Sequence, residues 1–496
     1  MKKLYASFFL LLLLSAVTTS SGQSLRISPD NIDGNGYDYA KVIGQDDDGV
    51  YLLMSNLSLE SSRDRFGLKT RKYELSYYGP DLQPRWRKAI EADPEGGSLE
   101  NIGFFNGKAV VVSSELVKSN AEFNLYISVL NAKGEAIVKG LKIYSGAVGK
   151  SADLSKPRLL VSPDKQYLGV AVEESSNGTI FVHLGTVNDQ FQASRQARAA
   201  LNFSVKEAEL SEFALTGKED LLFLAYRKDP QEGEKSKLRK FSLYMLSQAD
   251  QRTREYSVNT AGQQMTEAAL VIDRINNKAI VTGFYADKTS FAGASLLYAT
   301  LNLGQADQFQ VKTGQLNNDA QLKLVGQRNT GGGVSLISYP IQRVIPRSDG
   351  GALLIAEAAY LSEYNFYDYF TQTFNRRLEF HFDNILALSV NADGSIHWSQ
   401  LIQKEQSSLD DEGLYSSFNT ILSPDELVVI FNNEIGRNNE IVGHAIDARG
   451  QLQVRKLSKK TDSISLLPRS GKQVDENTLI VPAVTKKRLF LVRIEI

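Results

Sequence analysis

The sequence of 496 residues contains no cysteine. Disulfide bonds, a thiol nucleophile and a lipid-modified cysteine are therefore excluded. A chain of this size must be held together by a hydrophobic core instead, and its 42% content of hydrophobic residues supplies the material for one.

An excess of basic residues is also missing. Lysine and arginine number 56 against 57 aspartate and glutamate residues, so that the formal net charge is −1. Proteins that bind nucleic acid usually carry a basic excess or a basic stripe, and we therefore expect no nucleic-acid partner.

Long apolar runs are absent except near the N-terminus, where two lysines precede the run Phe8–Leu14. The small residues Ser20 and Gly22 follow at positions −3 and −1 of a cleavage site. This order is typical of a secretory signal peptide, and the run is too short to span a bilayer stably. We expect residues 1–22 to be removed. Residues 23–496 would then act in the periplasm, at the cell surface or outside the cell, without a transmembrane segment.

A short apolar strand, a polar turn and a second apolar strand recur along the whole chain. The turns are DDDG (46–49), FNGK (105–108), SPDK (162–165), TGKE (216–219), INNK (275–278), RSDG (347–350), SPDE (423–426) and VDEN (474–477). β-Branched or aliphatic runs of strand length follow them. A repeat of roughly 50–60 residues has the size of a propeller blade.

A second series of hairpins alternates with the first. It comprises 73–86, 125–138, 180–193, 242–255, 296–311, 385–398 and 441–454, and an eighth hairpin opens at 488–496, where the sequence ends. Each unit thus has four strands, A to D, but the last unit lacks strand D. The segment SLRIS at 24–28 is the candidate for it, because its insertion would close the ring and remove exposed sheet edges.

These repeats predict an all-β fold, a β-propeller of eight four-stranded blades forming a single domain. Seven blades are the alternative. The turn in NADGSIHW, with Asp393, Gly394 and Trp398, resembles the C–D turns of exported bacterial β-propeller proteins, in which an Asp or Asn and a Gly precede a Trp-bearing outer strand. NAKGEAIV and DARGQLQV are weaker copies. The resemblance implies the fold and no particular activity.

In a propeller the A–B and C–D turns lie on one face, and the B–C and D–A connections lie on the other. The first group is short here, whereas the second includes the long segments 55–72, 227–240 and 312–340. Loops on a rigid scaffold commonly carry binding residues, so we expect the functional site on the loop-rich face.

Aromatic residues are concentrated in YNFYDYFTQTFNRRLEFHF (364–382), between strands B and C of the sixth unit. Phe382 alternates in phase with Leu386, which predicts that strand C runs on beyond the blade. A turn near 373–377 would complete a hairpin insertion at about 360–384, with arms of about 30 Å.

Two interpretations of these rings remain open. In one, they pack the hairpin onto a neighbouring blade or onto the segment 312–340. In the other, they form an exposed platform that stacks on sugars or anchors a protein partner. The candidate ligand-binding residues are Tyr364, Tyr367, Tyr369, Arg376, Arg377 and His381.

Oxygen donors at alternate positions, Asn31, Asp33 and Asn35, precede Gly36 in a weak match to a calcium loop. Calcium loops begin with Asp and end with a bidentate acid, where this chain has Val42. A plain turn is the stronger interpretation, and calcium is the one cofactor that the sequence suggests.

No catalytic residue is assigned. The four histidines, His183, His381, His397 and His444, belong to different hairpins, and no two have the spacing of zinc ligands. A nucleophile elbow is missing, and SGAVGKS lacks the first glycine of a phosphate loop. Glu357, Glu363 and Asp368 are the acids of the loop-rich face that an enzyme could use.

The sequence favours an exported binding or scaffold propeller that recognises an envelope or secreted protein, or an extracellular glycan. The alternative is a carbohydrate-active enzyme, a glycosidase or lyase, with paired carboxylates at the channel mouth. The positions of Tyr364 and Tyr367 relative to Arg376 and Glu379 distinguish the two kinds of partner. An apolar group of rings fits a protein, and rings beside polar groups fit a glycan.

Overall fold

The structure is a computed structural model of the chain. It describes residues 24–29, 31–32, 39–56, 72–201, 203–204, 206–228, 239–258, 264–286, 295–316, 339–368, 372–435, 439–459, 463–485 and 488–496. The predicted signal peptide and the greater part of the three long segments of the loop-rich face lie outside these residues.

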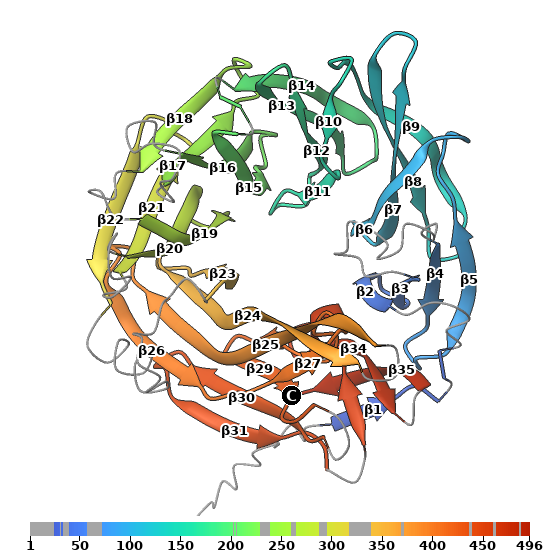
Figure 1. The fold of residues 1–496 in the computed structure, drawn as a ribbon, viewed down its shortest axis with the longest axis vertical. Coiled ribbons are helices and arrows are strands. Elements are labelled where there is room, and N and C mark those ends of the chain that lie inside the picture. The colour runs from blue at the N-terminus through green and yellow to red at the C-terminus, as the bar shows by residue number, and fades with distance from the viewer. Residues whose placement is uncertain are drawn as a thin grey trace, which may run out of the picture.

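Eight antiparallel sheets follow one another in chain order around a central axis (Figure 1). Blade 1 contains β2 (Tyr39–Gln45), β3 (Val50–Ser55), β4 (Tyr73–Tyr78) and β5 (Pro84–Ile90). Blade 2 contains β6 (Ser98–Phe105), β7 (Lys108–Val117), β8 (Glu122–Leu130) and β9 (Ala136–Ala147). Blade 3 contains β10 (Asp153–Leu154), β11 (Arg158–Val161), β12 (Tyr167–Ser176), β13 (Thr179–Asn188) and β14 (Ala193–Leu201). Blade 4 contains β15 (Ala208–Leu215), β16 (Leu221–Lys228), β17 (Arg239–Leu246) and β18 (Thr253–Val258).

The second half of the ring repeats this arrangement. Blade 5 contains β19 (Gln264–Asp273), β20 (Lys278–Ala286), β21 (Ser295–Asn302) and β22 (Phe309–Gln315). Blade 6 contains β23 (Ile341–Pro346), β24 (Ala352–Asp368), β25 (Thr373–Val390), β26 (Ile396–Ile402) and β27 (Ser407–Leu409). Blade 7 contains β28 (Asn419–Leu422), β29 (Glu426–Asn432), β30 (Ile441–Asp447) and β31 (Leu452–Lys456). Blade 8 contains β32 (Ile464–Leu466), β33 (Lys472–Gln473), β34 (Thr478–Thr485), β35 (Arg488–Glu495) and β1 (Ser24–Ile27).

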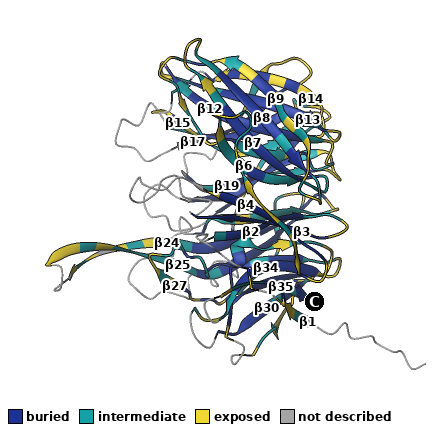
Figure 2. Ribbon diagram, turned by 90° about the vertical axis from the view of Figure 1, so that its right-hand side faces the viewer, coloured by how far each residue is buried: buried dark blue, intermediate teal, exposed yellow. Residues whose placement is uncertain are grey.

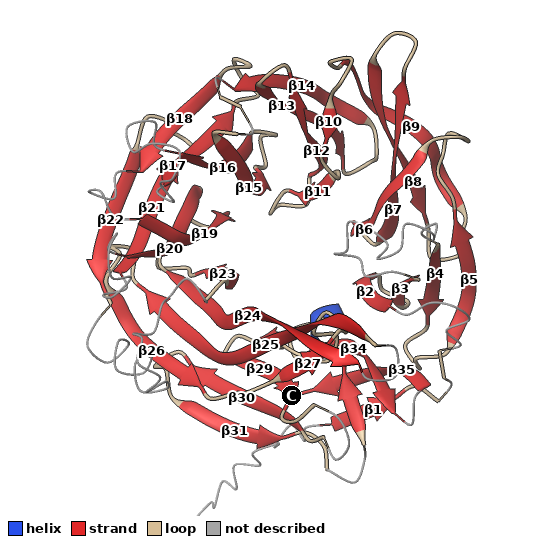
Figure 3. Ribbon diagram, in the orientation of Figure 1, coloured by secondary structure: helices blue, strands red, loops and turns tan. Residues whose placement is uncertain are grey.

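Helical structure is almost absent. Within the described ranges, the one helical element is a short 3₁₀ turn, η4 (Pro468–Ser470), drawn in blue in Figure 3. Across the same ranges, no helix has the length and apolar character needed to cross a membrane.

The N-terminal strand closes the ring, as predicted. β1 pairs with β35 in antiparallel register from Ser24 opposite Glu495 to Ile27 opposite Val492. The side chain of Ile32 is buried just beyond it. The count of eight blades is therefore confirmed, and the two ends of the chain share blade 8.

The core consists of eight clusters of buried side chains, one between each pair of consecutive blades. Strands B and C are buried on both sides because each blade packs between two neighbours, and all six residues of β3 are buried. Continuous apolar runs such as YLLM arise from this two-sided burial. The outer strand β14 alternates buried and exposed residues along most of its length.

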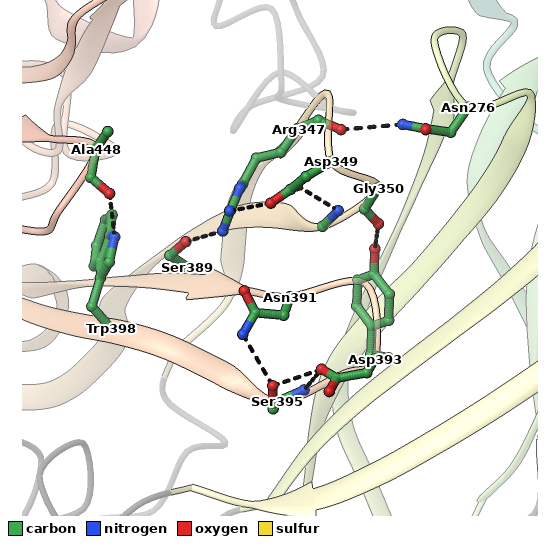
Figure 4. A network of polar contacts seen from close by, with 12 residues as sticks. Asn276, Arg347, Asp349, Gly350, Ser389, Asn391, Asp393, Ser395, Trp398 and Ala448 are labelled. Carbon is green, nitrogen blue, oxygen red and sulfur yellow. Dashed lines mark hydrogen bonds and ion pairs between the residues drawn. The ribbon is translucent and has the colours of Figure 1, made fainter.

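The Trp-bearing turn signature has a structural role. The Trp398 indole N–H donates to the carbonyl oxygen of Ala448 in the C–D turn of blade 7, at 3.0 Å (Figure 4). Trp86 makes the same contact with Ala132 in blade 2, at 2.6 Å. The Trp398 ring covers Gly450, where an added Cβ would lie 2.7 Å from ring atoms. Both tryptophans therefore join consecutive blades on the face with short turns.

Candidate functional site

The hairpin predicted at about 360–384 is present. β24 and β25 pair along their whole length, from Ala352 opposite Val390 to Asp368 opposite Thr373. Figure 2 shows this hairpin projecting from one face of the ring, far beyond the other described elements. The turn predicted near 373–377 is wrong, because these residues continue the cross-strand ladder and the strands are joined by residues 369–372.

A β-bulge separates the hairpin from its blade. The register shifts at Ala358, so that two residues of β25 face one residue of β24. Phe382 therefore shares a face with Ile385, and the phase predicted with Leu386 is wrong. The Phe382 ring contacts Arg469 of η4 in blade 8, whose guanidinium lies 5.2 Å from the ring centroid.

The root of the hairpin contains a buried ion pair. The Lys404 ammonium lies 2.8 Å from the Glu357 carboxylate, and both side chains are almost fully buried. Ser417 donates a hydrogen bond to the same carboxylate. Lys404 also donates to the carbonyl oxygen of Phe382 and to Oε1 of Gln406. Burial raises the pKa of Glu357, and the nearby Lys404 opposes that increase. Glu357 is thus enclosed by protein, out of reach of a substrate.

A third strand covers one edge of the root. β27, from the connection that follows strand D of blade 6, pairs with β25 between Glu379 and His381. The ladder ends at Asp410, whose carboxylate accepts the N–H of Leu378 at 3.0 Å. The root is therefore three-stranded, whereas the tip is a two-stranded ribbon among the described residues.

Exposed apolar side chains gather on one face of the hairpin, which we call the apolar face. Leu361, Tyr367 and Phe374 are 53%, 39% and 77% exposed. Tyr367 and Phe374 lie opposite each other, with ring centroids 5.1 Å apart in an edge-to-face arrangement. An ion pair between Arg376 and Glu363, at 2.6 Å, lies on the same face.

The opposite face is more polar. Tyr360 stacks on His381 with ring centroids 4.4 Å apart, and its hydroxyl lies 3.1 Å from the Asp383 carboxylate. Nearer the tip, the Arg377 guanidinium lies 4.6 Å from the centroid of the Phe366 ring. These contacts hold the rings of this face against their neighbours.

The structure divides the predicted ligand-binding residues between the two faces. Tyr367 and Arg376 belong to the apolar face, by their cross-strand register. By the same register, Tyr364, Arg377 and His381 belong to the other face, and the His381 side chain is only 18% exposed. Tyr369 lies outside the described residues.

Sequence reasoning missed two members of the apolar face. Phe374 lies opposite Tyr367, and Leu361 belongs to the same face of β24 as Tyr367. The signal for this shared face was the alternation of side-chain direction along a strand. The misplaced turn concealed that signal, because it put Phe374 in a loop.

The predicted calcium loop remains a prediction. Asn31 is exposed, whereas Asp33 and Asn35 lie outside the described residues. Ile32, beside Asn31, is buried and pairs with Leu489, which accounts for the position of Asn31 without a metal. Where the chain is described, no group of three or more histidine, aspartate and glutamate side chains lies close enough to hold a metal ion.

A second pair of acids belongs to the inner strands, which surround the central axis of the ring (Figure 1). Glu212 on β15 and Glu267 on β19 stand on inner strands of consecutive blades, each at a register shift. Burial raises the pKa of Glu267 to about 7, and the negative charge of Glu212 adds to the increase. Glu212 is accessible to solvent, yet the surrounding protein raises its pKa as well.

No known protein family and no curated protein matches the chain. Similar solved structures include the β-propeller domain of the trilobed protease from Pyrococcus furiosus, at 8% identity and a TM-score of 0.36, covering 86% of this chain and 98% of that one. Prolyl oligopeptidase B from Galerina marginata has 8% identity and a TM-score of 0.41, covering 90% of this chain and 55% of that one. The α-L-arabinanase from Penicillium chrysogenum has 12% identity and a TM-score of 0.29, covering 60% of this chain and 98% of that one. Similarity at this level does not allow the activity of these proteins to be assigned to this chain. The propeller assignment depends on the chain's own eight sheets.

Proposed function

We propose that this propeller is an exported binding protein that holds an envelope or secreted protein on the apolar face of its hairpin. The observation that carries this proposal is the exposure of Leu361, Tyr367 and Phe374 on one face of an element that projects from the ring. Apolar groups of this kind mark interaction sites on soluble proteins, and aromatic side chains supply much of the binding energy at protein interfaces.

The chemistry of the apolar face favours a protein over a glycan. Tyr367 lies against Phe374, and Arg376 is already paired with Glu363. A glycan site would need exposed rings beside polar groups that are free to bind hydroxyls. Glu379 is not such a group, because it belongs to the opposite face and lies 3.5 Å from His381.

The rigid root supports the same proposal. A recognition element loses less conformational entropy on binding if it is already ordered. Here β27 covers one edge of the hairpin and the Glu357–Lys404 pair fills its base.

The test is capture of partners from the envelope and medium of the source organism. Mature protein 23–496 is compared with a trimmed form in which Asn-Gly replaces residues 364–377, so that the Glu363–Leu378 pair closes a short hairpin. This design keeps β27 and the buried root intact. A protein retained by the intact form and lost from the trimmed form supports the proposal, provided that both forms melt at similar temperatures.

A point variant sharpens this experiment. Phe374→Ser removes the most exposed ring of the hairpin, and Val454→Ser removes a comparably exposed apolar side chain on β31, at 57% exposure. The first should abolish capture and the second should leave it unchanged. Equal capture by both variants, or capture of polysaccharide only, would overturn the proposal.

The channel acids favour a second candidate, the carbohydrate-active enzyme. The negative charge of Glu212 contributes to the raised pKa of Glu267, and a carboxyl group with a pKa near 7 is suited to general acid catalysis. Hydrolysis or lyase activity toward envelope polysaccharides that disappears in both Glu212→Gln and Glu267→Gln would favour this candidate. Activity that survives both changes would exclude these residues.

A further inference from the structure

Among the described residues, no strand covers the outer edge of β24 near the hairpin tip. β23 pairs with β24 only as far as Ala356, and the N–H of Glu357 is taken by the carbonyl oxygen of Pro340. Beyond that point, no described strand pairs with this edge from Leu361 to Phe366. Figure 2 shows this part of the hairpin standing clear of the ring.

The two edges of the hairpin differ in whether another strand covers them. The edge of β25 is covered by β27 and its ladder is ended by the Asp410 side chain. In the edge of β24, residues 359–368 contain no proline and no lysine, the two residue types that most directly prevent strand addition. Such an edge is a template for another strand.

We propose that the open edge of β24 pairs with the same edge of a second copy of this chain, in antiparallel register about a two-fold axis at Tyr364. The register places Leu361 of each copy opposite Tyr367 of the other, and Glu363 opposite Asn365. A two-fold interface uses one surface twice and must therefore complement itself. Here exposed apolar residues meet each other, and a carboxylate meets an amide that can donate a hydrogen bond to it.

Neighbouring registers are less favourable. A shift of two residues in one direction places Glu363 directly opposite Glu363 of the second copy, where like charges repel. A shift of two residues in the other direction places Glu363 opposite Tyr367. Shifts of one residue bring side chains of opposite faces together and break up the apolar face.

The dimer would contain a four-stranded sheet in the order β25, β24, β24 and β25. Each copy would add its Leu361 to the other's Tyr367 and Phe374, and the apolar face would double in length. This inference concerns the purified protein alone, so its test does not depend on whether a partner is captured.

The absence of cysteine makes a cross-linking test direct. In the proposed register the two Tyr364 Cα atoms would be about 4.5–5.5 Å apart, within the range of a disulfide. Tyr364→Cys should therefore form a covalent dimer under mild oxidation. Asn375→Cys, on β25, is the control, because the two β25 strands would be about 14 Å apart, three strand spacings, and should not cross-link.

Two further measurements complete the test. A mixture of Leu361→Cys and Tyr367→Cys chains should give a mixed disulfide dimer, whereas each variant alone should not. Sedimentation of the unmodified protein should show twice the mass of one chain, and Leu361→Lys should weaken the dimer roughly tenfold. A monomer at all concentrations, or equal cross-linking at positions 364 and 375, would overturn the inference.

Discussion

The root and the tip of the hairpin are made of the same two strands but have opposite physical character. At the root, Glu357 and Lys404 are almost fully buried, and Phe382 packs against Arg469. At the tip, Phe374 is largely exposed and the ion pair of Arg376 and Glu363 faces water. Charged and aromatic side chains therefore stabilise the fold at the enclosed root, and the same residue types are available for recognition at the exposed tip.

The largest expected effect is at the buried ion pair. Lys404→Ala leaves the Glu357 carboxylate buried without its partner, and we expect a loss of about 3–5 kcal/mol in the free energy of unfolding. Urea unfolding of the parent and the variant measures this loss of free energy. The double variant Glu357→Leu with Lys404→Met should recover most of the loss, because apolar side chains of similar volume replace both charges. A loss below about 1 kcal/mol in the single variant would contradict the structural role of the root.

Two phenylalanines allow a matched comparison of root and tip. Phe382→Ala removes a ring that packs closely against Gly413. A Cβ added at Gly413 would lie only 2.3 Å from the Phe382 ring. We expect a loss of about 2 kcal/mol, because a cavity forms at a partly enclosed site. Phe374→Ala should change stability by less than about 0.5 kcal/mol, since its ring is exposed. Equal losses of stability in the two variants, measured by thermal unfolding, would contradict the difference between root and tip.

A pH experiment extends the comparison to the channel, where a buried acid has an acid as its neighbour instead of a lysine. The pKa of Glu267, raised by burial and by Glu212, is about 7. The folded state therefore holds a proton that the unfolded state releases near pH 4.5, and stability should fall as the pH rises from about 4.5 to 7. Glu267→Gln should remove about 1 kcal/mol of this loss. An unchanged pH profile of the unfolding midpoint in the variant would show that Glu267 titrates normally.

The smallest effect is expected at the exposed ion pair. Arg376→Gln should lower the free energy of unfolding by no more than about 0.5 kcal/mol, because both side chains are solvated. The difference between variant and parent should shrink further in high salt. A loss comparable to that of Lys404→Ala would mean that this ion pair is enclosed in solution.

Much of the architecture could be predicted from the sequence. Each of the eight A–B turns connects the two strands that it was expected to connect, and the segment 24–28 supplies the missing strand of blade 8. These predictions succeeded because turn residues and apolar runs act locally and recur. Asp393 accepts the N–H of Ser395 at 2.9 Å within its own turn, which is a contact between near neighbours in the chain.

The sequence predicted that the hairpin exists, but not the position of its turn or its bulge. Asn375 and the adjacent arginines suggested a turn, yet Asn375 pairs with Phe366 in the ladder. The bulge at Ala358 also escaped prediction, because alternation alone does not reveal a register shift. As a result, the predicted phase between Phe382 and Leu386 was wrong.

The candidate site was accessible to sequence reasoning only in part. Tyr367 and Arg376 were identified, whereas Leu361 and Phe374 were not. The acids Glu212 and Glu267 lie 55 positions apart in the sequence (267 − 212), and the charge of one acts on the other because β15 and β19 are inner strands of consecutive blades. No local pattern marks such a pair.

The sequence by itself determined the repeating four-stranded unit and the strand that closes the ring, and it favoured eight blades over seven. These features follow from short-range preferences: turn residues that reverse the chain and apolar runs that are buried on both faces. The tertiary structure decided which charged residues are enclosed, which rings are exposed and which acids affect each other's surroundings. Burial and charge proximity depend on contacts between distant parts of the chain, and only the closed ring brings those parts together.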